Sequence, residues 1–162
     1  MSSAAVSAQL FFEIYHVYAR YTEVLDDGPL ERWPDFFTEQ CMYQIVPRDN
    51  YDRGLPVAIM RCESRAMIAD RVTAIQETMV FEPRYLRHQT SDIRIDQATA
   101  RSVNVLANFS VIEILPNELP RVLMAGRYLD QLERDQHDAW LYREKICVFD
   151  SVLVANSIVY PI

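Results

Sequence analysis

The stretch VNVLANFSV, residues 103–111, is apolar at every second position. This period of two marks one face of a β-strand, because successive side chains of a strand point to opposite faces of its sheet. A nine-residue run with a single apolar face predicts a long strand whose apolar face is buried. That face consists of Val103, Val105, Ala107, Phe109 and Val111.

Further strands are expected on both sides of this stretch. The two-residue period begins near residue 86, where Ile93 and Ile95 later alternate with charged residues. The polar segments PNELP (116–120) and RDQHD (134–138) have the composition of turns, so they would connect consecutive antiparallel strands. The other expected strands cover residues 41–46, 121–133 and 139–150.

Helices are expected in the first half of the chain. Apolar residues recur at steps of three and four from Leu10 to Leu25, which predicts one buried helix face, and Gly28 and Pro29 end that helix. Residues 29–37 predict a second, short helix interrupted near Pro34, and residues 47–56 predict a loop. The helical period returns over residues 63–79, a third helix with Ser64 as its candidate cap.

Helices followed by long antiparallel strands predict an α+β domain. Three amphipathic helices against four long meandering strands favour a curved sheet wrapped around a helix, the cone of the nuclear-transport-factor-2-like fold. We expect a single cone-fold domain over residues 1–162, because half of the residues are hydrophobic and no segment has the composition of a linker.

Composition excludes several functional classes. The net charge of −7 argues against nucleic-acid binding, because an acidic chain repels phosphates. No apolar run reaches the roughly 18 residues that span a membrane, and the N-terminus lacks the basic flank of a signal peptide. A cytoplasmic protein is therefore expected, with Cys41, Cys62 and Cys147 as reduced thiols.

The stretch VFEPRYLRHQTSD, residues 80–92, concentrates ionisable groups and raises the question of catalysis. A metal site is not indicated, because His16, His88 and His137 fall on separate elements and no paired ligand motif occurs. One catalytic hypothesis remains, general acid–base chemistry at the mouth of the cone. It would use His88 or an aspartate with Tyr15 or Tyr43 and would suit a free-standing isomerase or dehydratase acting on a small hydrophobic substrate.

Several motifs resemble the small, or beta, subunit of bacterial aromatic-ring-hydroxylating dioxygenases, and their order and spacing extend the resemblance from about Leu10 to Ile162. They are WPDFFTEQCMYQIVPRDNYDRGLP, ES…MIADRV, FEPRYLRHQTSD and the ending DS…NSIVYPI. The relatives implied act on aromatic carboxylates such as salicylate, anthranilate, benzoate or terephthalate.

The resemblance implies a division of labour between subunits. A large alpha subunit would hold a Rieske [2Fe-2S] cluster and a mononuclear iron, and this chain would hold no cofactor. The small subunits would form a trimer under a trimer of large ones, an alpha3beta3 hexamer. This chain would then be a non-catalytic assembly subunit of an oxidoreductase.

The same resemblance gives residues 80–92 a structural role. Arg84, Arg87 and His88 match a basic motif of the family at the entry to the sheet, and they would belong to a structural or interface polar network. Glu63 and Asp70 on the third helix, or a neighbouring subunit, are the expected partners, because guanidinium groups satisfy carboxylates bidentately.

Two apolar segments are also candidates for burial or assembly. Phe36 and Phe37 are expected in the core, whereas Trp33 could be an aromatic anchor for the large subunit. The hydrophobic end of the chain is expected to be buried in the subunit or at an interface. Its apolar residues are Val152, Leu153, Val154, Ile158, Val159 and Tyr160.

Overall fold

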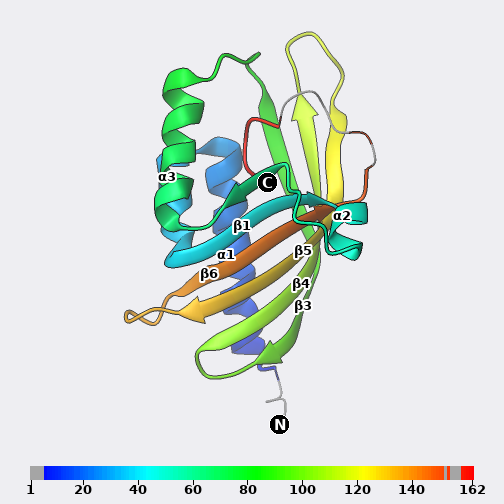
Figure 1. The fold of residues 1–162 in the computed structure, drawn as a ribbon. Helices are drawn as coiled ribbons and strands as arrows, with labels where there is room; N and C mark the ends of the chain where they lie inside the picture. Colours follow the sequence, from blue (N-terminus) through cyan, green and yellow to red (C-terminus); the bar gives the residue numbers. More distant parts are fainter. Residues whose placement is uncertain (1–5, 152, 154–157) are drawn as a thin grey trace.

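A computed structural model describes residues 6–151, 153 and 158–162. Six strands form one sheet in the order β2-β1-β6-β5-β4-β3, and the sheet curves around the first helix (Figure 1). The elements in chain order are α1 (Ala8–Asp27), the 3-10 helix η1 (Leu30–Phe36), β1 (Phe37–Pro47), α2 (Arg48–Asp52), β2 (Met60–Cys62), α3 (Arg65–Thr73), the π-helix η2 (Ala74–Thr78), β3 (Tyr85–Ala98), β4 (Ser102–Ile114), β5 (Arg121–Arg134) and β6 (Trp140–Phe149).

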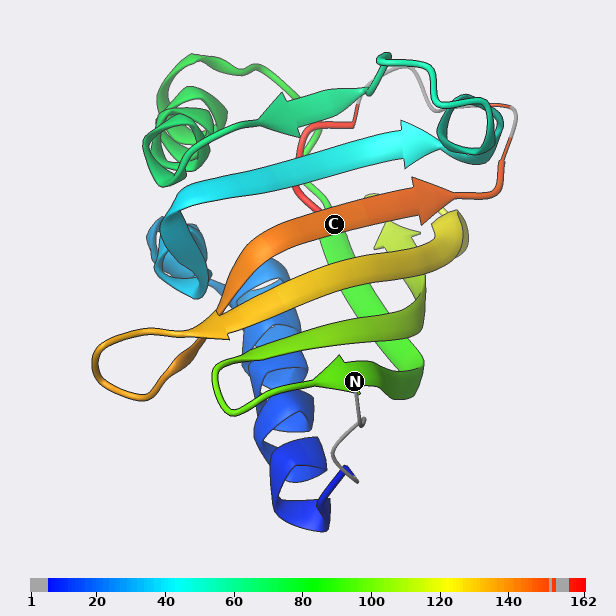
Figure 2. The same ribbon diagram turned by 60° about the horizontal axis from the view of Figure 1, so that its bottom comes forward.

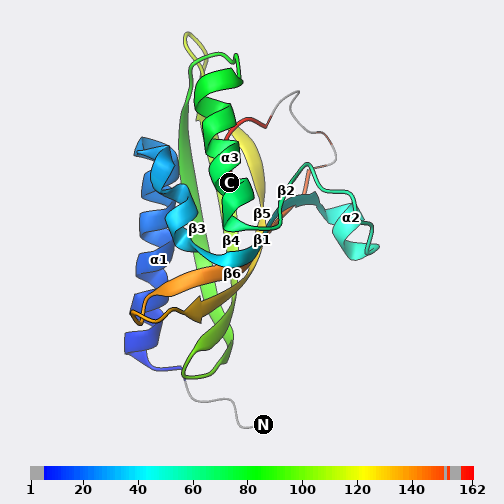
Figure 3. The ribbon, with the colours of Figure 1, turned by 60° about the vertical axis from the view of Figure 1, so that its left-hand side comes forward.

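The long helix α1 lies across the concave face of the sheet, as Figures 2 and 3 show from two directions. The hydroxyl of Ser7 caps its start by accepting a hydrogen bond from the backbone N–H of Leu10 at 3.1 Å. Gly28 ends it with a positive φ of 73°, a conformation that glycine adopts without strain. The predicted apolar face is confirmed, since Ile14 and Tyr21 are fully buried.

The strand pattern at residues 103–111 is confirmed. All five apolar residues of that face lie in the core, with exposed fractions between 0 % and 4 %. Strand β4 pairs antiparallel with both β3 and β5, whereas the pairing of β1 with β6 is parallel. The α+β class and the cone are therefore as the sequence predicted, with one parallel pairing that the pattern did not reveal.

The first half of the chain differs locally from expectation. Strand β1 begins at Phe37, earlier than predicted, and residues 30–36 form a 3-10 helix, since Pro34 lacks the N–H that an α-helix needs. The loop after β1 contains the short helix α2, and the three-residue strand β2 was not predicted because it is too short to show a period. The third helix changes from α to π geometry after Thr73.

Trp33 is a core residue with an exposed fraction of 0 %, so its prediction as an interface anchor is wrong. Its Nε1 donates a hydrogen bond of 3.2 Å to the hydroxyl of Tyr21, and its ring packs edge-on against Phe37 and Tyr43. Because the indole N–H is bonded and the ring is packed inside the chain, Trp33 is not available to a partner subunit.

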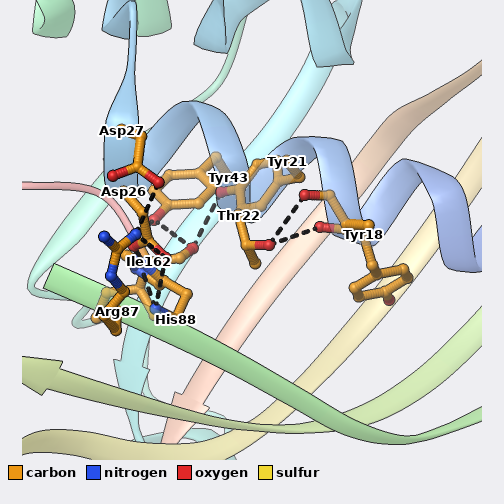
Figure 4. Close-up of polar contacts among 10 residues, drawn as sticks. Tyr18, Tyr21, Thr22, Asp26, Asp27, Tyr43, Arg87, His88 and Ile162 are labelled. Atoms are coloured by element: carbon orange, nitrogen blue, oxygen red, sulfur yellow. Dashed lines mark hydrogen bonds and ion pairs between the residues drawn. The ribbon is translucent and has the colours of Figure 1, made fainter.

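The end of the chain enters the same core in part. The carbonyl oxygen of Ile162 accepts hydrogen bonds from the hydroxyls of Tyr21 and Tyr43, at 3.0 and 3.2 Å (Figure 4). Val159 is buried, and Ile158 and Tyr160 are partly buried. Leu153 is 86 % exposed in the subunit, so its burial at an interface stays a prediction, while Val152 and Val154 lie outside the described residues.

Candidate functional site

Arg87 and His88 point to opposite sides of β3 and contact consecutive carboxylates at the end of α1 (Figure 4). The buried His88 ring places Nδ1 2.6 Å from Oδ1 of Asp26, and the same carboxylate accepts from the backbone N–H of His88 at 3.0 and 3.1 Å. The guanidinium of Arg87 lies 2.7 Å from Oδ2 of Asp27, and this second pair is exposed. The cluster therefore joins the end of the helix to the sheet.

The electrostatics of α1 explain this arrangement. A helix C-terminus carries a partial negative charge, so Asp26 and Asp27 in its last turn are unfavourable by themselves, and the turn contains no basic residue. Arg87 and the N–H donors of His88 come from β3 and supply the missing positive potential. Asp26 was not predicted as the partner of His88, although two adjacent acidic residues at a helix end were an available signal.

Arg84 pairs with a carboxylate that is buried. Its guanidinium lies 2.7 Å from Glu113, whose side chain is 1 % exposed, and Arg121 approaches the other oxygen of the same carboxylate at 2.7 Å. The expected partners on the third helix are wrong. Glu63 pairs with Arg61 at 2.6 Å, and within the described part of the chain Asp70 forms no ion pair with Arg84 or Arg87. The strand pairing of β4 with β3 and β5 brings Glu113 between the two arginines.

A second buried centre lies on the inner faces of β5 and β6. Lys145, the only lysine of the sequence, has a fully buried side chain whose Nζ lies 2.8 Å from Oδ2 of Asp130. The hydroxyl of Tyr18 on α1 donates to the same carboxylate. The lysine cation also faces the rings of Tyr18, Tyr21, Tyr128 and Tyr142, with distances to their centroids of 3.6 to 5.0 Å.

Burial controls the titration of this centre. It raises the pKa of Asp130 above its ordinary value, because removing the carboxylate from water outweighs the opposing attraction of Lys145. Burial likewise raises the pKa of Tyr18 and Tyr128 well above the ordinary value. Our sequence analysis did not single out this centre, although Asp130 and Lys145 stand at inward positions of predicted strands, where a charged residue is a signal.

The arrangement contains acid–base groups that are mostly buried, although Asp26 and Arg84 line a pocket of about 200 Å³. A histidine–aspartate pair and a tyrosine–aspartate–lysine cluster could both move protons. However, the side chain of His88 is 1 % exposed, and those of Asp130 and Lys145 are 0 % exposed. Of the tyrosines considered for catalysis, Tyr43 is fully buried, with its hydroxyl bound to Ile162, and Tyr15 is half exposed beside His16.

Neither a metal centre nor a membrane helix is found in the described ranges. Among those residues, no group of three or more His, Cys, Asp or Glu side chains could hold a metal ion. The three cysteines are buried and free, in agreement with the expected reduced thiols. The helices of that part of the chain are also too short or too polar to cross a bilayer.

Comparisons with known proteins give the family. Residues 20–155 match the family model described as the ring hydroxylating beta subunit. The chain is 35 % identical over 162 residues to the small subunit of anthranilate 1,2-dioxygenase from Burkholderia cepacia, with both chains covered completely. It is 30 % identical to a beta subunit of terephthalate 1,2-dioxygenase from Comamonas, covering 89 % of this chain and 93 % of that one.

A solved structure agrees with the sequence comparisons. The beta subunit assigned to an aromatic-ring-hydroxylating dioxygenase of Novosphingobium aromaticivorans superposes with a TM-score of 0.84 and 30 % identity, covering 94 % of this chain and 97 % of that one. The fold thus occurs in a class of small subunits of multi-subunit oxidoreductases. The chain belongs to the family of beta subunits of aromatic-ring-hydroxylating dioxygenases.

Proposed function

We propose that this chain is the non-catalytic assembly subunit of the terminal oxygenase of an aromatic-ring-hydroxylating dioxygenase. Its partner would be a large alpha subunit that holds the Rieske [2Fe-2S] cluster and the mononuclear iron, in an alpha3beta3 complex located in the cytoplasm. The observation that carries the proposal is the sealing of the ionisable clusters: Lys145 and Asp130 have side chains with no exposed area, so no substrate reaches them.

The relatives support an aromatic carboxylate as the substrate of the complete enzyme. Anthranilate and terephthalate, which name the two relatives above, are both aromatic acids. We propose an anthranilate-like acid first, because that relative matches over the full length of both chains. A benzoate- or salicylate-like acid remains within the proposed class.

Exposed apolar surface supports assembly. On the outer face of the sheet, Tyr85 and Val122 are 70 % and 66 % exposed, and they stand opposite Ile114 and Ile112 of β4. Apolar side chains that cluster on one face of a sheet are suited to a protein interface. Strand β3 is moreover a long edge of the sheet, and an edge that is covered by a neighbouring subunit is protected from aggregation.

The proposal is tested by co-expressing this chain with its large subunit and measuring assembly and turnover separately. The complex should hydroxylate an aromatic acid, and light scattering should report a hexamer, whereas Val122→Glu should weaken association. His88→Asn should retain most of the turnover per assembled complex, because Asn still donates one hydrogen bond. If the His88→Asn complex assembles normally but has lost turnover, His88 belongs to a catalytic site. The cone-fold isomerase or dehydratase would then be the leading interpretation.

A further inference from the structure

A groove lies between η2, the segment before β3 and the end of the chain. It has a volume of about 580 Å³ and is lined mainly by apolar side chains, among them Leu30, Ile75, Met79 and Phe81. That volume falls within the range of about 300 to 1,000 Å³ that is typical of small-molecule sites. Figure 1 shows the C-terminal segment, in red, beside the first part of β3.

Arg84 is the only charged side chain among the residues that line this groove. The guanidinium has three neighbours: Nε donates to the carbonyl oxygen of Glu82 at 3.1 Å, one terminal nitrogen lies 2.7 Å from Glu113, and Cζ lies 6.0 Å from the centroid of the Phe81 ring. Its second terminal nitrogen has no hydrogen-bond partner among the described residues. A guanidinium fixed in this way is a preorganised donor for a carboxylate.

The charge balance also favours an anion. Glu113 accepts from Arg84 at one oxygen and from Arg121 at the other, so a single carboxylate faces two guanidinium groups. The three side chains carry one net positive charge, which Glu118 offsets in part because it lies 3.9 Å from Arg121. Because Arg84 is only 13 % exposed, solvent screens that charge less than it would on an open surface.

The walls of the groove suit a planar apolar group. The rings of Phe81 and Tyr160 meet edge-on with their centroids 5.4 Å apart. On the opposite side, the π-helix η2 presents Ile75, and single π-turns are frequent at functional sites.

We propose that this groove binds a small monocarboxylate with an apolar body, its carboxylate on Arg84 and its body between Met79, Phe81 and Tyr160. The proposal does not depend on the assembly role, because all of its residues belong to this chain.

The test is a calorimetric titration of the full-length chain with benzoate as the probe. We expect saturable binding in about the millimolar range, as is usual for so small a ligand. Benzamide, which lacks the charge, and acetate, which lacks the apolar body, should each bind about tenfold more weakly or not at all. Equal binding of all three probes, or no saturation by benzoate, would overturn the proposal.

Two variants place the probe in the groove. Arg84→Gln should weaken benzoate binding about tenfold or more, while Arg87→Gln, which lies three residues further along the chain and outside the groove, should bind as the unaltered chain does. Since Arg84→Gln alters a buried pair, Met79→Glu is the second variant; it adds a negative charge at a partly exposed position and should abolish binding in a chain with unchanged circular dichroism. Unchanged affinity in both variants contradicts the proposal.

The assembled complex gives a further readout. Binding of benzoate to this groove should persist when the large subunit is added, and it should still respond to Met79→Glu. If the large subunit displaces benzoate in proportion to complex formation, the groove is a subunit interface and the proposal is wrong. That outcome would leave the proposed assembly function standing, so the failures of the two proposals are distinguishable.

Discussion

Replacing Lys145 by Met should destabilise the folded chain in a strongly pH-dependent way. The substitution keeps most of the side-chain volume but leaves the carboxylate of Asp130 without its ion partner in a position with no exposed area. Removing one partner of a buried ion pair costs on the order of 3–5 kcal/mol. The loss cannot exceed the free energy of protonating Asp130 in the folded state, which is about 1.4 kcal/mol for each pH unit above an unfolded-state pKa of about 3.9.

The sign of the pH dependence follows from the direction of the pKa shift. Burial already raises the pKa of Asp130, and the loss of the lysine raises it further. A group with a raised pKa contributes its stability fully below the unfolded pKa and loses it as the pH rises through the folded pKa. The destabilisation by Lys145→Met should therefore be small near pH 4 and reach about 4 kcal/mol at pH 7.

Urea unfolding followed by tryptophan fluorescence measures this difference, at one fixed protein concentration because association stabilises the folded state. Arg143→Met on the same strand is the control, and it should show no comparable pH dependence. The double variant Asp130→Asn, Lys145→Met should recover much of the loss at pH 7, because no buried charge remains. A loss that is constant from pH 4 to pH 8, or single-variant effects that simply add, would refute this account of the pair.

The remaining predictions concern packing, the exposed ion pair and thiol chemistry. Gly126→Ala should lower the melting temperature by several degrees, since its Cβ would lie 2.0 Å from the carbonyl oxygen of Val148, and a normal melt would contradict the close strand approach. Arg87→Met should change the melting temperature less than Lys145→Met does, because both Arg87 and Asp27 are more than half exposed, and a larger drop would indicate a hidden partner. Cys147 should react with a disulfide reagent only on unfolding, because burial raises the pKa of its thiol to about 12; rapid labelling of the native chain would show that it opens.

The sequence was informative wherever one residue period extended over many positions. The strand at residues 103–111 and the apolar face of α1 follow from local spacing alone. In each segment one period, that of a strand or that of a helix, is repeated often enough to exclude the alternative element. The three-residue strand β2 carries no such pattern, and it exists because Met60 and Cys62 pair with β1. Predicting β2 would require knowledge of its partner strand and of the register in which the two strands pair.

The polar contacts could not be predicted for the same reason. His88 and Asp26 are 62 positions apart in the sequence, and Lys145 and Asp130 meet only through the register of β5 with β6. Sequence spacing drew attention to His88, but it could not reveal Asp26, the carboxylate that the ring contacts. Trp33 was misjudged because enrichment of tryptophan at interfaces is a statistical tendency, whereas its burial depends on Tyr21, an acceptor on another helix.

The polar contacts between α1 and the sheet share one geometric feature, which leads to a last prediction. They join α1 to the sheet near its start, middle and end: Glu13 accepts from Arg134 at 2.6 Å, Tyr18 donates to Asp130, and Asp26 accepts from His88. Apolar packing alone permits a helix to slide by small steps, whereas directional hydrogen bonds at three heights fix its position. We therefore expect these contacts to fix the position of α1 while contributing little to the free energy of unfolding.

The triple variant Tyr18→Phe, Asp130→Leu, Lys145→Met removes the middle contact together with its buried charges. Its free energy of unfolding should stay close to that of the unaltered chain, because apolar replacements of a buried pair are often neutral or stabilising. Amide hydrogen exchange in α1 should nevertheless become faster than in β4, since the helix loses its fixed register while the sheet keeps its pairing. Exchange in α1 that remains as slow as before, at equal stability, would mean that apolar packing alone places the helix and that the polar contacts are a consequence of that placement.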